Sequence, residues 1–539
     1  MISPVTLLHR TSTMNRLFYV EELVQWIAFS VDEGSTGSTS LLALACCCKA
    51  LEGPVMDILW QRQKFLPVIL RTLPVDCWTF TNKVYVSGLY LNPSGHLFPI
   101  VQRLVRTPTT REWERFRVYT GRVVELCVGR ESGMAVSSET IAFLGMQSTL
   151  DPLWPRLTSL RLSNGLGWDS VASTLAFLSP KINTLALILP RDTSILLQPI
   201  LSITSDRCQC VQELVLDVVV DNPQSPHWVG GLISACRDTI RTLEIHSPFK
   251  VEYLPIIANL PQLRKLLLER AHFSTDIPLG AFPVLEHFTF LRFQGRRLQH
   301  FLKRMCTTNL KEARIISIDA IDFKKSVKAL SKFSTSLEYL EIWDVTGLEL
   351  LRIPALGPPF TNLRNLHLRC FRWGENFHNP CGFRPSDRAI AELGASMPNL
   401  TNLSLGNPTC PDLQCVTFLS LVSLAKACHD LDTLEIKINF GTMVTLPLFT
   451  SEEAETNLIL EETWSSGCRL RKLVLGLSIL TEHPDSGWLV AVGLGRIFPL
   501  LSEVEGYGFD RSKWEQIGKN VRMSRQVLHN VEAATSLSL

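Results

Sequence analysis

The sequence predicts an α/β fold, in which a long solenoid of strand–helix repeats follows a small helical module. The main observation is a six-residue pattern, apolar-x-x-apolar-x-apolar, that recurs along most of the 539 residues. A second is that residues 17–60 instead space their apolar side chains at helical intervals. The composition agrees, because 46% hydrophobic and 19% charged residues supply a continuous apolar core.

The repeated pattern is the strand signature of a leucine-rich repeat, since alternate side chains of a strand point into one core. The best copies begin at Leu157, Leu263, Leu363 and Leu400. Ten further copies make fourteen in all, and these begin at Val123, Ile182, Val211, Ile240, Leu285, Leu310, Leu337, Leu431, Leu470 and Leu501. We therefore expect repeats over residues 123–510.

The spacing of the copies predicts the form of each repeat. It is mostly 22 to 31 residues, which accommodates one strand and one helix with two turns. Leu421, Leu424 and Cys428, for example, lie at helical intervals just before the copy at Leu431. These features predict a ribonuclease-inhibitor-like horseshoe, with a parallel sheet and outer helices.

Residues 511–539 are predicted to form a C-terminal capping helix, because Trp514, Ile517 and Val521 share one helical face. The pair Ser512 and Glu515 has the spacing of a capping box and places the start of that helix.

Residues 15–65 are predicted to form a module of three helices. Apolar stripes run through Leu23 and Ile27, through Leu41 and Leu44, and through Val55, Ile58 and Leu59. The dipeptide Gly53-Pro54 is expected to end the second helix and begin the third. Such a small bundle is rarely stable alone, so we expect it to need a partner or the repeat array. Residues 66–122 are predicted to be a helical linker and N-terminal cap.

Charge and hydropathy limit the classes of partner. The 53 basic and 51 acidic residues give a net charge of +2, which predicts no overall attraction to nucleic acid or anionic lipid. We find neither a signal-peptide pattern in Met1–Arg16 nor an apolar stretch of the ~20 residues that span a bilayer. The expected location is the cytoplasm, the nucleus or both, with no membrane or nucleic-acid partner.

The sequence contains no motif that predicts catalysis. It has no P-loop, no HExxH and no GxSxG at a strand-to-helix turn. The 15 cysteines show no paired CxxC spacing, and the clusters at Cys46–Cys48 and Cys208–Cys210 lack a second ligand pair. We therefore expect no catalytic residues, no metal site and no cofactor.

The segment from Leu41 to Trp60 resembles the second half of an F-box, in the version common in fungal (basidiomycete-type) F-box proteins with leucine-rich repeats. The stretches Leu66–Pro74 and Trp113–Tyr119 are also similar to that family, so the resemblance covers nearly the whole chain. Two departures are Val20, where the family usually has proline, and a longer loop over Asp32–Ser40.

The resemblance implies a substrate-recognition subunit of an SCF-type (Skp1–cullin–F-box) E3 ubiquitin ligase. Its F-box would bind a Skp1-type adaptor, and through it a cullin, while the repeats bind an unknown protein substrate. The implied adaptor-binding residues are Leu23, Ile27, Leu41, Leu44, Cys48 and Trp60. The alternative for these residues is that they form an internal helical core.

For the whole protein, one alternative is a leucine-rich-repeat scaffold whose degenerate F-box does not engage the ligase. Another is a catalytic or GTPase-activating repeat protein, although the tail Asn530–Leu539 carries one Glu where such proteins usually have an acidic segment.

The repeat pattern also predicts a substrate-binding surface. Residues that flank the second and third apolar positions of each copy face the concave side of the sheet. Tyr339, Trp343, His367 and Arg369 lie at such positions, and aromatic and Arg side chains are enriched at binding hot spots. Trp373 belongs to an aromatic insertion, Phe371–Phe383, that is expected to fold over this face as a lid. The alternatives are an insertion packed on its own repeat and a surface that is only solvated.

Overall fold

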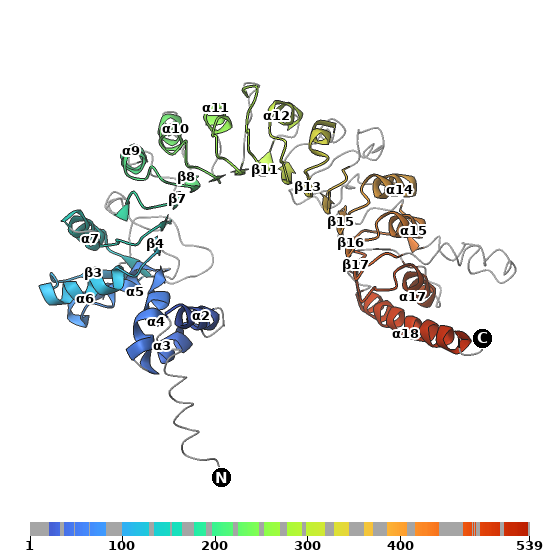
Figure 1. Cartoon of the computed structure of the whole chain (residues 1–539), viewed down its shortest axis with the longest axis horizontal. Helices are drawn as coiled ribbons and strands as arrows, with labels where there is room; N and C mark the ends of the chain where they lie inside the picture. Colours follow the sequence, from blue (N-terminus) through green and yellow to red (C-terminus); the bar gives the residue numbers. More distant parts are fainter. Residues whose placement is uncertain are drawn as a thin grey trace, which may run out of the picture. The chain divides into compact units, whose positions relative to one another are not determined.

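The structure, a computed structural model, consists of two compact units, Met1–Ser247 (unit 1) and Pro248–Leu539 (unit 2). In each unit, parallel strands alternate with helices (Figure 1). The residues that the structure describes are 21–32, 37–47, 49–63, 65–81, 100–128, 134–150, 153–163, 177–189, 197–218, 225–246, 253–269, 277–293, 298–317, 328–343, 360–369, 385–406, 416–440, 467–476, 478, 480, 486–506 and 511–536.

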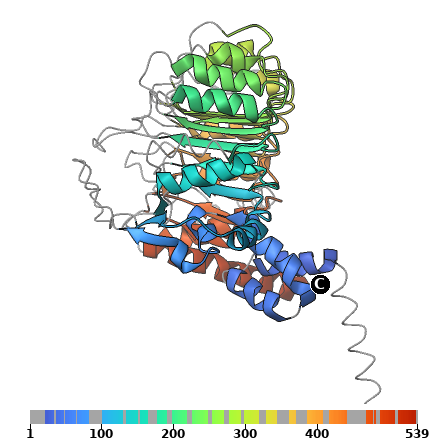
Figure 2. The ribbon, with the colours of Figure 1, turned by 90° about the vertical axis from the view of Figure 1, so that its left-hand side faces the viewer.

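In addition to a separate small sheet of β2 (Trp78–Thr81), β3 (Ile100–Leu104) and β5 (Met134–Val136), unit 1 contains a parallel sheet whose strands follow one another in chain order. The strands are β1 (Arg62–Gln63), β4 (Glu125–Val128), β6 (Ser159–Leu162), β7 (Thr184–Leu189), β8 (Glu213–Val218) and β9 (Thr242–Ile245). Helices α7 (Ser138–Leu150), α9 (Leu197–Arg207) and α10 (Ser225–Ala235) lie along one face of this sheet (Figure 2).

The register of this sheet shows why the sequence repeats. The second apolar residues of successive copies pair with one another across the strands, as Leu126 does with Leu160 and Leu214 with Leu243. All four leucines are at most 2% exposed. A column of leucines one strand apart therefore forms the core, which no single repeat buries alone.

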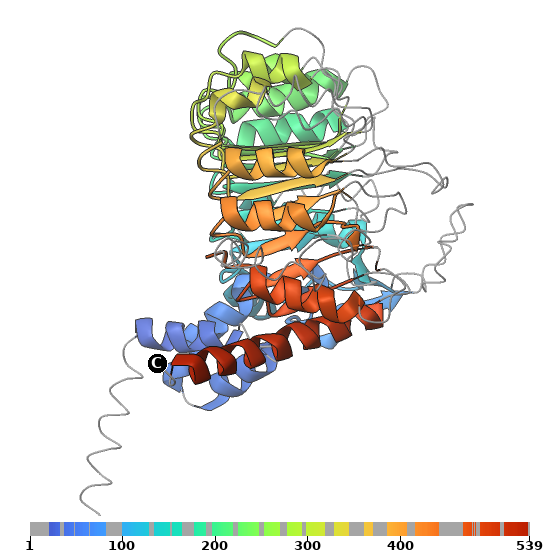
Figure 3. The same ribbon diagram turned by 90° about the vertical axis from the view of Figure 1, so that its right-hand side faces the viewer.

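Unit 2 continues the same construction. Its strands are β10 (Lys265–Glu269), β11 (His287–Phe293), β12 (Glu312–Ser317), β13 (Tyr339–Trp343), β14 (Asn365–Arg369), β15 (Asn402–Leu405), β16 (Thr433–Glu435), β17 (Lys472–Val474) and β18 (Glu503–Glu505). Its helices are α11 (Leu254–Ala258), α12 (Leu298–Arg304), α14 (Asp387–Ser396), α15 (Phe418–Ala427), α17 (Ser486–Ile497) and α18 (Arg511–Ser536). Figure 3 shows α14, α15 and α17 stacked one above another.

The strands confirm the repeat pattern. Each of the fourteen predicted copies contains a strand that begins two residues after its first apolar residue, including the less regular copies at Val123, Leu310 and Leu501. The helix predicted before Leu431 is α15, in which Leu421 and Leu424 are fully buried. The period-two alternation of the strands and the helical spacing between them were thus both correct.

The N-terminal helices differ from the prediction in where they break. They are α2 (Glu21–Asp32), α3 (Gly37–Cys47) and α4 (Lys49–Gln61), and Pro54 lies inside α4. The prediction that Gly53-Pro54 separates two helices is therefore wrong. Proline at the sixth position of a helix removes one backbone hydrogen bond and crowds the carbonyl four residues earlier. The burial of Leu51 and Val55 on both sides of Pro54 offsets this cost.

Residues 66–122 are less helical than predicted. This stretch contains α5 (Leu66–Leu70) and α6 (Thr110–Thr120), but also β2 (Trp78–Thr81) and β3 (Ile100–Leu104). These two strands pair antiparallel with each other, and β5 (Met134–Val136) pairs parallel with β3. Alternating β-branched and aromatic residues at Trp78–Thr81 favour a strand, and pairing with β3 stabilises it.

The predicted C-terminal helix is α18, and it packs against α17 and β18. Trp514, Ile517 and Val521 are at most 2% exposed. Its start differs from the prediction, because Ser512 is already inside the helix and Glu515 pairs with Arg511 at 3.1 Å. The capping-box interpretation of Ser512 and Glu515 is therefore wrong.

Candidate protein-binding surfaces

The three N-terminal helices of unit 1 share a small apolar core. Val24 and Ala28 of α2 meet Leu41 and Ala45 of α3, together with Leu51, Val55 and Ile58 of α4. These residues lie three or four positions apart on each helix, so that one face of every helix points inward.

Helix α2 carries a second apolar face that points to solvent. Leu23, Trp26 and Ile27 are 42%, 74% and 48% exposed. Their spacing of three and four residues places them side by side on the helix surface. Leu42 of α3 is also exposed. Helix α2 is therefore apolar on its exposed face as well as on its buried face. Apolar side chains gathered on an exposed face are typical of a surface that contacts a partner.

The six residues predicted to bind an adaptor fall into different environments. Leu23 and Ile27 are exposed, whereas Leu41 is 0% exposed and belongs to the core. The prediction that Leu41 contacts a partner is therefore corrected. Leu44 is half-buried against the same core, and Cys48 lies outside the described residues.

Trp60 is also half-buried, and its ring centroid lies 4.8 Å from that of Tyr119 in α6. Its indole nitrogen is buried and has no hydrogen-bond partner in the described part of the chain. Trp60 thus joins the helical module to α6. The prediction did not include Trp26, although its position three residues after Leu23 was a usable signal.

In unit 2, the predicted substrate-binding residues lie on two adjacent strands. Tyr339 pairs with Asn365, Glu341 with His367, and Trp343 with Arg369. Both strands alternate half-buried and buried residues, so these six side chains occupy the face opposite the apolar core. Of the five predicted residues, four are therefore brought together, and Trp373 lies outside the described residues.

Glu341 links the two aromatic residues of β13. Its carboxylate accepts a hydrogen bond of 2.9 Å from the Tyr339 hydroxyl and one of 2.6 Å from Nε1 of Trp343. The pKa of Tyr339 is raised to about 12, chiefly by burial and next by the charge of Glu341. Both rings are therefore held in fixed positions by one carboxylate.

Two arginines cover these rings. The guanidinium of Arg314 lies 4.7 Å from the centroid of Tyr339, and that of Arg369 lies 5.6 Å from the centroid of Trp343. Both contacts are within cation–π range. Arg314 also donates to Glu312 at 2.5 Å, and Arg369 donates to Glu435 at 3.0 Å.

His367 completes this group, with its ring centroid 5.4 Å from that of Tyr339. Burial lowers the pKa of His367, so the neutral imidazole is favoured beside the two arginines. We call the set Arg314, Tyr339, Glu341, Trp343, His367 and Arg369 the aromatic network. Arg314 and Glu341 were not singled out from the sequence, although the repeat register places both on the same face.

A possible metal site in unit 1 has a different explanation. Asp76, Cys77 and Glu112 place their ligand atoms within 4.8 Å of one another. Arg106, however, lies 2.8 Å from the Asp76 carboxylate and 2.9 Å from that of Glu112. The pKa of Glu112 is lowered to about 2, chiefly by its hydrogen bonds with Arg106. The group is therefore an ion-paired cluster that joins the start of β2 to α6.

Within the described parts of the chain, no helix has both the length and the apolar character needed to cross a membrane. No protein-family model matches the sequence, and no curated protein matches it either. The class that the fold defines is an α/β repeat protein with a small helical module, whose described surfaces offer side chains suited to contacts with other proteins.

Proposed function

We propose that this protein is the substrate-recognition subunit of an SCF-type E3 ubiquitin ligase. In this proposal, the helical module is an F-box that binds a Skp1-type adaptor, and through it a cullin. The strands belong to leucine-rich repeats that bind a protein substrate. The observation that carries the proposal is the apolar exposed face of α2, joined in one chain to an array of strand–helix repeats.

The exposed face of α2 is suited to an adaptor contact. Leu23, Trp26 and Ile27 offer large apolar side chains from consecutive turns of one helix. Helices that dock into grooves use anchors at this spacing. Trp26 is the most exposed of the three, and tryptophan is enriched among residues whose truncation costs about 2 kcal/mol or more.

The aromatic network is suited to a protein substrate. Tyrosine, tryptophan and arginine are enriched in interface hot spots, and here they are held in place by Glu341 before any partner arrives. A surface that is already ordered loses less conformational entropy on binding than a flexible one.

The proposed role requires no bond-making step by this chain. The protein holds its substrate at a high effective concentration near the ubiquitin-loaded enzyme, and positioning of the substrate lysine supplies the rate advantage.

The test is co-purification of the full chain with a Skp1-type adaptor from the same source. We expect Ile27→Asp and Trp26→Glu to abolish the interaction, because each places a charge in an apolar contact. The matched controls are Leu419→Asp and Trp488→Glu, which change exposed residues of α15 and α17 in unit 2. Circular dichroism should show native helix content in all four variants.

Failure of the wild-type chain to bind any of these adaptors would refute the proposal and leave a repeat scaffold that does not engage the ligase. Equal loss of binding in the controls would mean that the contact does not involve α2.

A further inference from the structure

A row of mostly charged residues lies at the beginning of the strands in unit 2. One residue precedes each strand from β10 to β17, and the signs alternate over most of the row. The row consists of Arg264, Glu286, Lys311, Glu338, Arg364, Thr401, Asp432 and Arg471. Because neighbouring strands of a parallel sheet are about 4.8 Å apart, each residue has the next as its lateral neighbour.

The row forms ion pairs at both of its ends. Glu286 lies 3.0 Å from Arg264 and 2.9 Å from Lys311. The pKa of Glu286 is lowered, chiefly by the hydrogen bond from Lys311. At the other end, Asp432 lies 3.5 Å from Arg471. Opposite charges on successive strands therefore stabilise one another.

Thr401 interrupts the alternation. Thr401 lies next to Arg364, at the position where alternation of charge would place an anion. Its hydroxyl donates a hydrogen bond of 3.0 Å to the backbone oxygen of Arg364. Arg364 and Glu338 are both exposed, and among the described residues no ion pair or side-chain hydrogen bond involves the guanidinium of Arg364 or the carboxylate of Glu338. Arg364 thus has an anionic neighbour in the row on one side, Glu338, and none on the side of Thr401.

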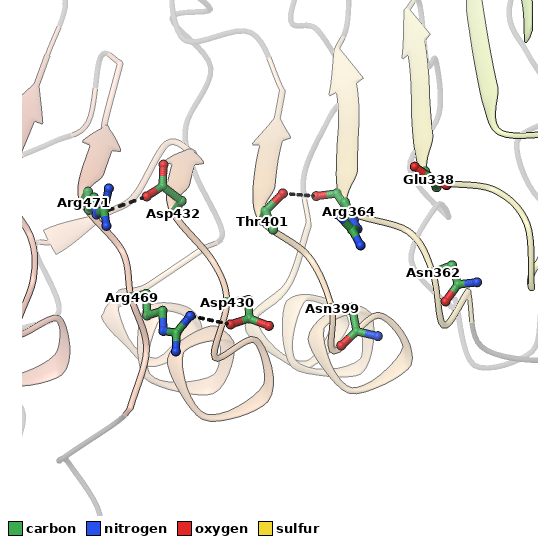
Figure 4. Close-up of a pocket in the computed structure, with 9 residues that line it drawn as sticks. All are labelled: Glu338, Asn362, Arg364, Asn399, Thr401, Asp430, Asp432, Arg469 and Arg471. Carbon is green, nitrogen blue, oxygen red and sulfur yellow. Dashed lines mark hydrogen bonds and ion pairs between the residues drawn. The ribbon is translucent and has the colours of Figure 1, made fainter.

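A hollow of about 710 Å³ opens at this interruption (Figure 4). A second tier of side chains, from the turns before the strands, lines it together with the row. The lining residues are Glu338, Asn362, Arg364, Asn399, Thr401, Asp430, Asp432, Arg469 and Arg471. The volume is within the range of ligand pockets, but the polar lining does not suit an apolar ligand.

The second tier is held in place by its own contacts. Nδ2 of Asn362 donates to the backbone oxygen of Thr335 at 2.5 Å, and Nδ2 of Asn399 donates to that of Thr361 at 2.6 Å. Asp430 pairs with Arg469 at 3.5 Å. Arg364 is therefore the cation of the hollow that is left to hold a ligand.

We propose that this hollow binds the carboxylate of an acidic side chain from a partner protein, with Arg364 as the residue that holds it. The carboxylate takes the place beside Arg364 that Thr401 leaves open. Glu338, Asp430 and Asp432 also line the hollow, so they disfavour a second carboxylate and select a segment of low negative charge. This site is separate from the aromatic network and does not depend on adaptor binding.

The test uses the full chain and two fluorescent hexapeptides that are acetylated and C-terminally amidated, Gly-Gly-Glu-Gly-Gly-Gly and the same peptide with Gln in place of Glu, so that the Glu side chain is the single carboxylate that differs. Fluorescence anisotropy should show binding of the Glu peptide that weakens as salt increases. Arg364→Gln should weaken it severalfold, because one ion pair of an exposed arginine is lost. The matched control Arg388→Gln removes an arginine whose side chain is 88% exposed on α14, and it should leave binding unchanged.

Three further variants separate the proposal from a folding defect. Glu338→Gln removes the competing anion and should tighten binding severalfold. Thr401→Glu supplies the missing anion from the chain itself and should abolish binding, whereas Thr401→Val should not. Equal binding of the two wild-type peptides, or unchanged binding by Arg364→Gln, would overturn the proposal. Adaptor co-purification should be unaffected by Arg364→Gln, so this proposal and that of the ligase subunit fail separately.

Discussion

Tyr339 donates a 2.9 Å hydrogen bond to Glu341, which lies two residues further along the same strand. Side chains two residues apart point to the same face of a strand, so the phenol and the carboxylate meet without distortion of the backbone. Trp343 uses the same geometry from the other side at 2.6 Å. One strand thus presents an aromatic pair whose rings are fixed through a shared acceptor.

We expect Glu341→Gln to lower the free energy of unfolding of unit 2 by about 1 kcal/mol. Tyr339 and Trp343 donate to different oxygens of the Glu341 carboxylate, and glutamine keeps one of these two oxygens. Urea unfolding followed by tryptophan fluorescence measures the change. Glu392→Gln, which breaks an exposed pair with Arg388 on α14, should cost about 0.5 kcal/mol or less. Equal effects of the two substitutions would contradict the central position of Glu341.

Leu41 and Leu42 are neighbours in α3 with opposite roles. Leu41 is 0% exposed and Leu42 is 52% exposed. Leu41→Ala should destabilise the helical module by about 2–5 kcal/mol, as buried leucine truncations do. Leu42→Ala should change its stability by about 0.5 kcal/mol or less. Hydrogen exchange of α2, α3 and α4 separates the two outcomes, and similar protection in both variants would count against the described core.

Gly506 makes a close approach to the C-terminal helix. A Cβ atom at Gly506 would lie 1.9 Å from Cδ1 of Trp514, whose side chain is fully buried. Gly506→Ala should therefore destabilise the attachment of α18 by about 1–3 kcal/mol. Gly467→Ala is the matched control, because nothing lies within 4 Å of its Cβ position. Thermal unfolding monitored by circular dichroism should show a lower midpoint for Gly506→Ala alone.

The Arg106 cluster predicts a pH dependence. The pKa of Glu112 is lowered from 4.5 to about 2 in the folded protein, chiefly by Arg106. A lowered folded pKa means that this contribution is present above pH 4.5 and is lost as the pH falls from there toward 2. Glu112→Gln should therefore reduce the loss of stability in that window, while Gln still permits a capping box with Thr109.

The measurement compares urea midpoints of the wild type and Glu112→Gln on both sides of that window. Glu114→Gln on the same helix is the control, because Glu114 is exposed. A parallel acid response of wild type and Glu112→Gln would show that this ion pair does not contribute.

Much of the fold was predictable because its signals are local. Whether a residue such as Leu160 or Leu366 faces the core depends on the alternation within one strand, which six consecutive residues reveal. The buried face of α18 was predictable for the same reason. The strands β2 and β3 were missed because their stability comes from pairing between segments about 20 residues apart, as in the register of Phe80 with Gln102.

The sequence by itself determined where the strands of the repeats and the C-terminal helix α18 lie and which of their faces are apolar. Only the tertiary structure decided which apolar residues remain exposed, because Leu23 and Leu41 have the same hydrophobicity and differ only in what packs against them. It also decided the partners of the polar side chains. Arg314 meets Tyr339, and Arg364 has Thr401 as its neighbour, because consecutive strands of the sheet pair side by side in this register.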